Sequence, residues 1–320
     1  MTDAFEFYER PESDELYLLA GWRQWADAGG MSSALPQYLI KRTDARTIGQ
    51  ISSAGFYLFQ FPGTHDLIRP VVKLNEGYPE SLEHHRNDFY HSKENLNNAL
   101  IFIGDEPHLN IEAYADAFLS AAQSLGVRRI VVFGGVYGEL PYEKERMVSC
   151  IYSLKPMKEE MAGLAVNLSN YQGGASIGSY LCRKAADREI EYVALYAFVP
   201  TYDLSNFAQS GSSIRLEHDF TAWLGVMRRV NFMLNLSFDL TDLERKSRKL
   251  KSFIDAKVEE LEQSAAQLGV RAYLNKLSES FEELPFNPLD DVWEEELRRL
   301  FDKFDAPDAS AGEKPDPRST

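Results

Sequence analysis

The chain has 320 residues, of which 44% are apolar, and its 34 basic and 49 acidic side chains give a formal charge of −15. This apolar fraction is ordinary for a packed globular core and excludes a wholly disordered chain. The acidic balance argues against nucleic-acid and anionic-membrane binding, which requires clustered Lys and Arg. The longest apolar run, 192–199, is far shorter than the roughly 20 residues of a membrane span. We therefore expect no nucleic-acid and no membrane partner.

The start of the sequence and its cysteines point to a cytoplasmic protein. Residues 1–7 are acidic and lack the basic flank and apolar core of a secretory signal. Cys150 and Cys182 fall in patterns typical of a buried strand and a buried helix, so we expect reduced core thiols. No Cys/His spacing indicates zinc, and we expect no metal.

The first part of the chain alternates β-rich runs with helical patterns. We expect a strand at 16–20, a helix at 31–41, and further strands or a hairpin within 46–74, where Phe, Tyr and Ile are interrupted by Pro and Gly. A strand at 99–103 follows. The helix predicted at 111–125 has apolar side chains at a period of about 3.6 residues.

The same alternation continues to residue 239. Apolar runs predict strands at 130–133, 163–168 and 191–199, and helical patterns cover 175–188 and 213–234. Because the strand runs are continuously apolar, both faces of the sheet are expected to be covered. The sequence therefore predicts a three-layer α/β/α fold with a mostly parallel sheet.

The remainder of the chain is dominated by helical patterns. Residues 241–267 form one long amphipathic pattern, and shorter helices are expected at 271–283 and 289–304. The apolar stripe of the long helix can pack on its own domain or associate with a second copy. We therefore expect an α/β domain at 1–239, a helical appendage at 240–304 and a disordered tail at 305–320.

Five loops of unusual composition are expected at the carboxyl ends of the strands, at 21–30, 104–108, 134–141, 171–178 and 200–203. Ligands of open α/β sheets bind at this edge. If the loops converge, they form a rim of glycines, aromatic rings and acids that can surround a small ligand or a peptide. The alternative is that the glycines make turns and the acids cap helices. The candidate pocket residues are Trp22, Asp27, Gly104, Asp105, Glu106, Gly134, Gly135, Tyr137, Gly173, Gly174 and Tyr202.

A hydrolase-like triad is available by sequence order. Residues 174–178 match the pattern G-x-S-x-G around Ser176, and Asp203 and His218 follow in hydrolase order. A nucleophile elbow follows its strand at once, whereas five residues intervene here. His218 also falls within a predicted helix. These three residues are therefore weak catalytic candidates.

His84, His85 and His91 form the histidine cluster of the sequence. Their polar neighbours predict an exposed segment rather than a metal site.

Several short motifs resemble those of the proteasome assembly chaperone 2 family. They are Gly-Trp at 21–22 with Asp-Ala-Gly at 27–29, Gly-Asp-Glu-Pro at 104–107, the run 125–135 that ends in Gly-Gly, and the turns at 171–174 and 199–202. The resemblance spans about residues 16–235. Where the family often has Pro-His-Thr-Arg-Pro, this chain has Pro-Tyr-Glu-Lys-Glu-Arg at 141–146. The C-terminal helices are similar to those of actinobacterial-type members.

The resemblance implies a fold like that of nucleoside phosphorylases and hydrolases, and a homo-oligomer such as a trimer. Relatives in eukaryotes and archaea act as proteasome assembly factors, some through a C-terminal hydrophobic-Tyr-X tail. The present sequence ends in Asp-Pro-Arg-Ser-Thr. Bacterial relatives sometimes carry an ATP-grasp superfamily label, but no Gly-rich loop is paired here with a Lys and metal-binding acids, so we expect no cofactor.

The sequence is compatible with two functions. The resemblance favours a homo-oligomeric binding or assembly protein whose partner is proteasome-related. The composition of the rim leaves room for a small-ligand enzyme, either hydrolase- or phosphorylase-like or an ATP-grasp-type ligase.

Overall fold

The computed structural model describes residues 4–13, 15–23, 25–60, 69–93, 96–203, 213–264, 269–284 and 286. The strands are β1 (Phe5–Phe7), β2 (Leu16–Arg23), β3 (Arg46–Ile51), β4 (Val71–Asn75), β5 (Tyr78–Glu83), β6 (Asn87–Ser92), β7 (Leu96–Asp105), β8 (Val127–Gly138), β9 (Val148–Tyr152), β10 (Asn167–Leu168), β11 (Glu191–Asp203) and β12 (Ser213–Arg215). The helices are α1 (Ala34–Arg42), α2 (Ile111–Ser124), α3 (Lys158–Ala162), α4 (Ile177–Asp187), α5 (Phe220–Met233), α6 (Thr241–Ser264) and α7 (Val270–Ser280), with 3-10 turns η1 (Ala28–Gly30) and η2 (Lys155–Met157). Residues up to Leu284 belong to one compact unit.

The main sheet has a parallel centre. Its strand order is β1-β3-β6-β7-β2-β8-β11-β9-β10, and β12 pairs with β11. Strands β7, β2, β8 and β11 run parallel to one another, whereas β6, β3 and β1 on one side and β9 on the other join by antiparallel pairing. The α/β class predicted from the alternating pattern is confirmed. Because the four central strands are parallel, they all end at one edge, which we call the carboxyl edge.

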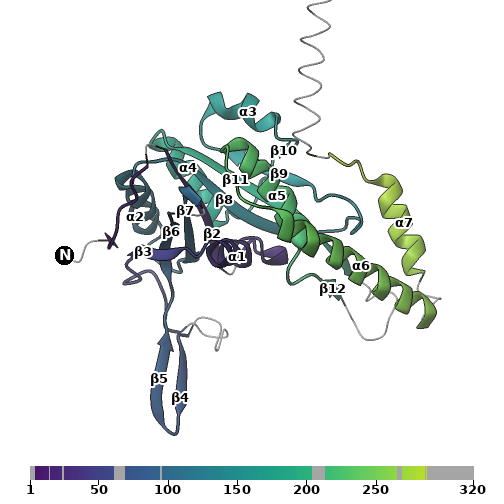
Figure 1. Cartoon of the computed structure of the whole chain (residues 1–320), viewed down its shortest axis with the longest axis horizontal. Helices are drawn as coiled ribbons and strands as arrows, with labels where there is room; N and C mark the ends of the chain where they lie inside the picture. Colours follow the sequence, from purple (N-terminus) through teal and green to yellow (C-terminus); the bar gives the residue numbers. More distant parts are fainter. Residues whose placement is uncertain are drawn as a thin grey trace, which may run out of the picture. The chain divides into compact units, whose positions relative to one another are not determined.

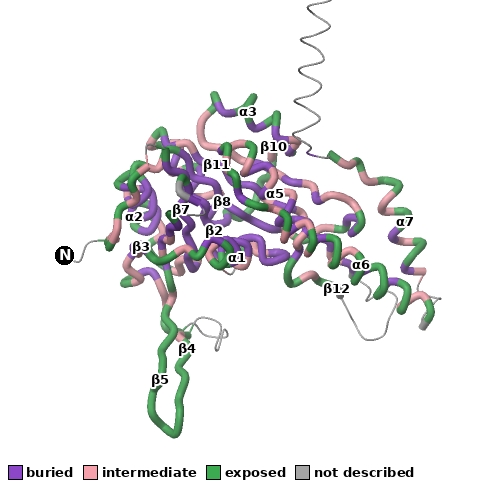
Figure 2. The backbone as a smooth tube through the Cα atoms, viewed as in Figure 1, coloured by how far each residue is buried: buried purple, intermediate pink, exposed green. Residues whose placement is uncertain are grey.

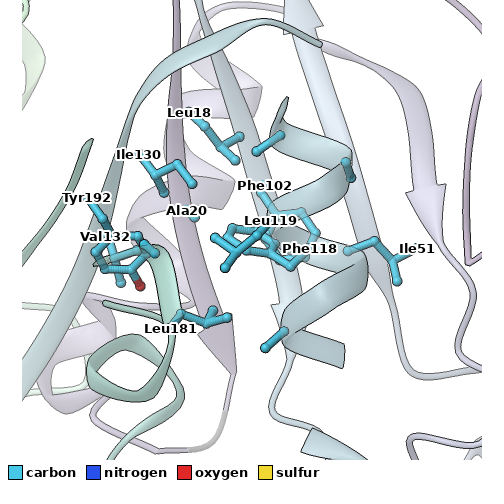
Figure 3. Close-up of a cluster of buried hydrophobic side chains, with 14 of the residues drawn as sticks. Leu18, Ala20, Ile51, Phe102, Phe118, Leu119, Ile130, Val132, Leu181 and Tyr192 are labelled. Carbon is cyan, nitrogen blue, oxygen red and sulfur yellow. The ribbon is translucent and has the colours of Figure 1, made fainter. Parts of the chain in front are cut away.

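Helices α2 and α4 cover one face of the sheet. Alternate residues of β2, namely Leu18, Ala20 and Trp22, share one buried cluster with Phe118 of α2 and Leu181 of α4. Figure 3 shows Phe118 and Leu181 between these helices and the strands. Each such fully buried side chain contributes about 1.5–3 kcal/mol to folding, so this layer fixes both helices on the sheet.

Helices α1 and α5 lie on the opposite face. Gly21 of β2 is placed beneath the start of α1, and a Cβ at this position would lie only 1.9 Å from the carbonyl oxygen of Ser32. The rings of Tyr38 in α1 and Trp223 in α5 pack with their centroids 5.8 Å apart. Because the sheet carries helices on both faces, the fold has the three layers that the sequence predicts.

Strands β4 and β5 form a separate hairpin in which every strand residue is exposed. Figures 1 and 2 show it extending away from the rest of the chain. Val72 pairs with Leu82 and Leu74 with Pro79, so these four apolar side chains lie on one face of the ribbon. The hairpin leads into β6 at the carboxyl edge, because Asn87 at the start of β6 is opposite Gly104 near the end of β7.

The C-terminal helices pack against the α/β part through a second cluster. Ile254 and Val258 of α6 and Leu274 of α7 are buried together with Tyr142 and Tyr202. The hydroxyl of Tyr142 also donates to Asp255 Oδ1 at 2.6 Å. The helical appendage therefore covers the loop after β8 and the end of β11.

Two predicted elements differ from the structure. Of the strand expected at 163–168 only Asn167 and Leu168 are in strand pairing, because the guanidinium of Arg229 binds the carbonyl oxygens of Leu164 and Ala165, which a strand would use. The helix expected at 213–234 begins only at Phe220, where Asp219 caps it. The predicted helix at 289–304 and the tail at 305–320 lie outside the described residues.

Candidate functional site

Four of the predicted rim loops, those after β2, β7, β8 and β11, start from the carboxyl edge. The ends of β2, β7, β8 and β11 lie side by side there. The loop 171–178 leads to the start of α4, where the amide of Ile177 donates to Glu106 Oε1 at 3.0 Å. The start of α4 is thereby held beside the end of β7.

Asp105, at the end of β7, is enclosed by basic partners. Arg23 binds both of its carboxylate oxygens, with N–O distances of 2.6 and 2.7 Å. Asp105 Oδ2 also accepts from the amide of Arg86 at 2.9 Å and lies 3.2 Å from His85 Nδ1. The residue is 2% exposed, so its carboxylate joins β2, β7 and the root of the hairpin.

His85 and His108 pack around Tyr57 beside this carboxylate. The rings of Tyr57 and His85 stack at 4.3 Å, and His108 meets both rings edge-on. His108 Nδ1 accepts a hydrogen bond from the amide of Leu58 at 3.1 Å. Burial, and secondly the neighbouring His85, lower the pKa of His108, which favours the neutral ring that this hydrogen bond requires.

The histidine segment is therefore less exposed than its composition predicts. His85 is mostly covered, and His91 in β6 is 3% exposed. Within the described part of the chain no group of three His, Cys, Asp or Glu side chains is arranged to hold a metal ion.

Trp22 and Gly104 belong to the core beneath the rim. The indole Nε1 of Trp22 donates to the hydroxyl of Tyr114 at 2.7 Å, and this hydroxyl donates to Asn87 Oδ1 at 2.8 Å. A Cβ on Gly104 would come within 2.8 Å of that indole nitrogen. Glycine at 104 therefore makes room for the tryptophan.

Asp27 holds the turn that precedes α1. Its Oδ1 accepts from the amides of Ser32 and Ser33 at 2.8 and 2.9 Å, and its Oδ2 accepts from the Ser33 hydroxyl. The neighbouring Gly135 approaches so closely that a Cβ would lie 2.1 Å from the carbonyl oxygen of Ala28. Asp27 thus accepts hydrogen bonds at the start of α1, which is the alternative in which the acids of the loops cap helices.

A fully buried ion pair lies beside this turn. Arg146 Nε and Asp219 Oδ2 are 2.7 Å apart, and both side chains are inaccessible to solvent. The amide of Asp219 donates to the carbonyl oxygen of Gly29, and Asp219 Oδ1 caps α5 by accepting from Thr221 and Ala222. One carboxylate therefore joins the loop after β8, the turn after β2 and the start of α5.

Glu106 and Ser176 lie together at the start of α4. Burial raises the pKa of Glu106, although the amide of Ile177 partly offsets this effect. The Ser176 hydroxyl accepts from the amide of Ser179 at 3.3 Å and lies 2.9 Å from the hydroxyl of Tyr196. Burial raises the pKa of Tyr196 to about 12, so this phenol is neutral and acts only as a hydrogen-bond partner near pH 7.

The three residues of the sequence-derived triad have different surroundings. Ser176 Oγ bonds with Ser179 and Tyr196 as its partners among the described residues. His218 is exposed before α5, with its ring against Phe220 and Trp223. Asp203 ends β11, but its side chain lies outside the described residues. The described contacts give the Ser176 hydroxyl no general base, which a serine nucleophile needs.

The remaining pocket candidates divide between packing and surface positions. A Cβ on Gly134 would lie 2.4 Å from the ring of Tyr196, and one on Gly173 would lie 2.2 Å from the Tyr171 hydroxyl, whereas Gly174 has open space. Tyr202 donates to the carbonyl oxygen of Leu140 at 2.7 Å and is covered by the C-terminal helices.

Several apolar side chains of the rim remain exposed. Trp25 follows β2, Leu109 follows β7, Tyr137 is near the end of β8, and Tyr171 precedes α4. Their exposed fractions are 64%, 42%, 42% and 74%. The guanidinium of Arg215 lies 5.5 Å from the ring centroid of Tyr137. The carboxyl edge therefore presents aromatic surface, whereas the carboxylates of Asp27, Asp105 and Glu106 are engaged within the protein.

Sequence reasoning missed the residues that bind these carboxylates. Arg23 follows the strand run directly and Arg146 closes the loop after β8, but nothing local shows which acid each one meets. The one available signal is the position of Asp219 immediately before an apolar helical run, which is typical of a helix cap.

The fold and site define an α/β/α protein whose rim residues mainly hold one another and leave aromatic side chains exposed. The sequence profile of the PAC2 family matches residues 22–258. The chain belongs to the PAC2 family, as the motif resemblance predicts. No curated protein matches the chain significantly, and none of the described helices is long and apolar enough to cross a membrane.

Solved structures from bacteria and archaea share this fold. A proteasome-assembly chaperone homologue from Mycobacterium tuberculosis is 19% identical, with 75% of this chain and 94% of that chain covered and a TM-score of 0.62. A PAC2 family protein from Streptomyces avermitilis is also 19% identical, with coverages of 79% and 99% and a TM-score of 0.64. An archaeal proteasome activator from Pyrococcus furiosus is 19% identical, with coverages of 80% and 98% and a TM-score of 0.56.

Proposed function

We propose that this chain is a homo-oligomeric assembly protein that binds a proteasome-related protein partner through the aromatic side chains of its carboxyl edge. Membership of the PAC2 family supports this proposal. So does the fold shared with an archaeal proteasome activator and with an archaeal homologue of proteasome-assembly chaperones. The proposal places the partner in the cytoplasm, where proteasome subunits assemble.

The observation that carries the proposal is the contrast between acids and aromatic rings at this edge. Asp27, Asp105 and Glu106 each accept hydrogen bonds from the protein itself, which disfavours roles as a general base or a metal ligand. Trp25 and Tyr171, in contrast, are largely exposed. Large aromatic side chains are enriched where proteins bind one another, because they bury much apolar area at a small cost in side-chain entropy.

Binding to purified proteasome subunits tests the partner. We expect the full-length chain to bind isolated α-type or β-type subunits from its own source in a pull-down or by calorimetry. The double variant Trp25→Ala/Tyr171→Ala should weaken that binding at least tenfold, as expected when interface aromatic anchors are truncated. Tyr8→Ala is the matched control, because Tyr8 is 61% exposed beyond the end of β1, away from the carboxyl edge. Equal binding by the double variant and the control would contradict the proposal.

Self-association is proposed to use the β4–β5 hairpin. A two-stranded hairpin is at best marginally stable alone in water, and Val72, Leu74 and Leu82 are more than half exposed on its apolar face. A second copy of the chain is a partner that is always present at the required stoichiometry, and the family resemblance implies an oligomer such as a trimer.

Native mass spectrometry tests this assignment. We expect the full-length protein to be oligomeric, and the variant Val72→Ser/Leu74→Ser/Leu82→Ser to be monomeric with unchanged circular dichroism. The control Lys73→Ser/Ser81→Ala/Glu83→Ser changes the opposite face of the same ribbon and should leave the oligomer intact. An oligomer that survives the apolar-face substitutions would rule out the hairpin as the contact.

A further inference from the structure

A cleft of about 280 Å³ lies between α5 and α6. The segment that contains Glu145 and Arg146 also lines it. Four cationic side chains line it, namely Arg146, Arg228, Arg248 and Lys251, together with the carboxylates Glu145 and Glu244. In a chain whose formal charge is −15, such a concentration of cations needs a physical explanation.

The carboxylates of this cleft are already paired. Asp219 neutralises Arg146 from behind the cleft wall. Glu145 and Glu244 both face Arg228, at N–O distances of 3.4 and 3.3 Å. These two distances are longer than those of strong charge-assisted hydrogen bonds, so the donors of Arg228 are only weakly engaged.

Arg248 and Lys251 are left without a carboxylate. Among the residues that the structure describes, neither side chain has an acidic oxygen within 4.0 Å. Lys251 Nζ donates to the carbonyl oxygen of Glu143 at 2.8 Å, which uses one of its three donors. Burial, and secondly repulsion by Arg146, lower the pKa of Lys251, although the nearby carboxylates of Glu145, Glu283 and Asp219 act in the opposite direction. A negatively charged ligand would supply the direct counter-charge that Arg248 and Lys251 lack within 4.0 Å among the described residues.

The cleft also has room for a small ligand at Gly225, in the middle of α5. A Cβ at this position would meet only Arg229 Nη1, at 3.6 Å. Glycine inside a helix costs about 0.5–1 kcal/mol relative to alanine, and no contact requires it here. The absent side chain therefore leaves the floor of the cleft open.

We propose that the cleft between α5 and α6 binds a small molecule that carries a phosphate or carboxylate group, held by Arg228, Arg248 and Lys251. Guanidinium forks bind both kinds of oxyanion in a bidentate manner, and the ammonium group adds a point charge. The bound molecule would join α5, α6 and the segment at Glu145 and Arg146. The cleft shares no lining residue with the exposed aromatic residues of the carboxyl edge, and its ligand binding does not depend on the protein-binding function.

Calorimetric titration of the full-length protein tests the proposal. The probes are inorganic phosphate and succinate, each at matched ionic strength in chloride, and we expect saturable binding of at least one of them. The probe that binds with the higher affinity identifies the ligand as phosphate-bearing or as a carboxylic acid. Lys251→Gln and Arg248→Gln should each weaken that binding about tenfold, the usual effect of losing one charge-assisted hydrogen bond. Lys249→Gln, an exposed neighbour that does not line the cleft, should leave it unchanged.

A second variant separates ligand binding from surface charge. Gly225→Leu adds no charge, favours the helix and fills the cleft, so it should abolish binding while the melting temperature without ligand stays equal or rises. Failure of both probes to bind the unaltered protein would overturn the proposal. Equal affinities for Lys251→Gln, Gly225→Leu and the unaltered protein would overturn it as well.

Discussion

Arg146 and Asp219, 73 positions apart in the sequence, form an ion pair from which solvent is fully excluded. Arg146 Nη1 also donates to the carbonyl oxygens of Tyr142 and Lys144. Asp219 in turn caps α5 and donates its amide to Gly29. Because both charges have several partners, the pair fixes the loop after β8 against two other elements.

Removing one member of this pair should be strongly destabilising. Arg146→Met and Asp219→Asn should each lower the free energy of unfolding by about 3–5 kcal/mol, because each leaves its partner without its buried counter-charge. The double variant should lower the free energy of unfolding by clearly less than the sum of the two single-variant losses. Urea unfolding of the four proteins gives the coupling energy directly.

The exposed pair Arg183–Asp187 provides the control for this measurement. Its side chains are 75% and 49% exposed, so Arg183→Ala should change stability by less than about 1 kcal/mol. Additive costs for Arg146→Met and Asp219→Asn would mean that the two side chains are not coupled.

Gly29 is expected to tolerate no side chain, for two separate reasons. Its φ of +63° disfavours any residue with a Cβ, and a Cβ would lie 2.9 Å from both the Asp219 Cβ and a methyl group of Val199. Gly29→Ala should therefore cost about 1–2 kcal/mol from the left-handed backbone and about 1–3 kcal/mol more from overpacking.

Gly126→Ala isolates the backbone contribution. Gly126, between α2 and β8, has a φ of +74°, but a Cβ at this position would meet no other atom within 4 Å, so only the backbone cost should appear in its unfolding curve. If Gly29→Ala were no more destabilising than Gly126→Ala, the close packing of the turn after β2 would be refuted.

The layered fold was predictable because its signals are local. The continuous apolar runs of β2, β7, β8 and β11 and the helical period of α2 are visible without any knowledge of tertiary contacts. The strand prediction at 163–168 was wrong for most of its length because a side chain distant in the sequence, Arg229, donates hydrogen bonds to the carbonyl oxygens of Leu164 and Ala165. Asp219 caps α5 at Phe220, and this helix therefore begins later than the sequence predicts.

The candidate site was predictable only in outline. Composition identifies the loops that contain Asp27 and Asp105, but it leaves open whether these acids face a ligand or the protein. That choice depends on partners such as Arg23, 82 positions before Asp105, and no local pattern specifies such a pairing. The sequence therefore shows which residue types each loop contains, but only the folded structure shows which partners they bind.

Ser176 is expected to behave as a helix cap rather than as a nucleophile. Ser176→Ala should lower the free energy of unfolding by about 0.5–2 kcal/mol, the usual cost of losing a side-chain acceptor at a helix start, and Ser176→Thr should restore most of it. A fluorophosphonate probe, which labels activated serines, should leave Ser176 unlabelled. Labelling that disappears in Ser176→Ala would instead establish an activated hydroxyl.

His108 should make the protein less stable in mildly acidic solution. Its pKa in the folded state is lowered, chiefly by burial, so below the unfolded value of about 6.5 the unfolded chain binds more protons than the folded one. Stability should therefore fall as the pH decreases from about 6.5 towards the lowered folded value. His108→Asn keeps an acceptor for the Leu58 amide and does not titrate in this range. The difference in urea midpoint between the two proteins should shift in favour of His108→Asn on acidification from about pH 7 to about pH 5, and a constant difference would contradict the prediction.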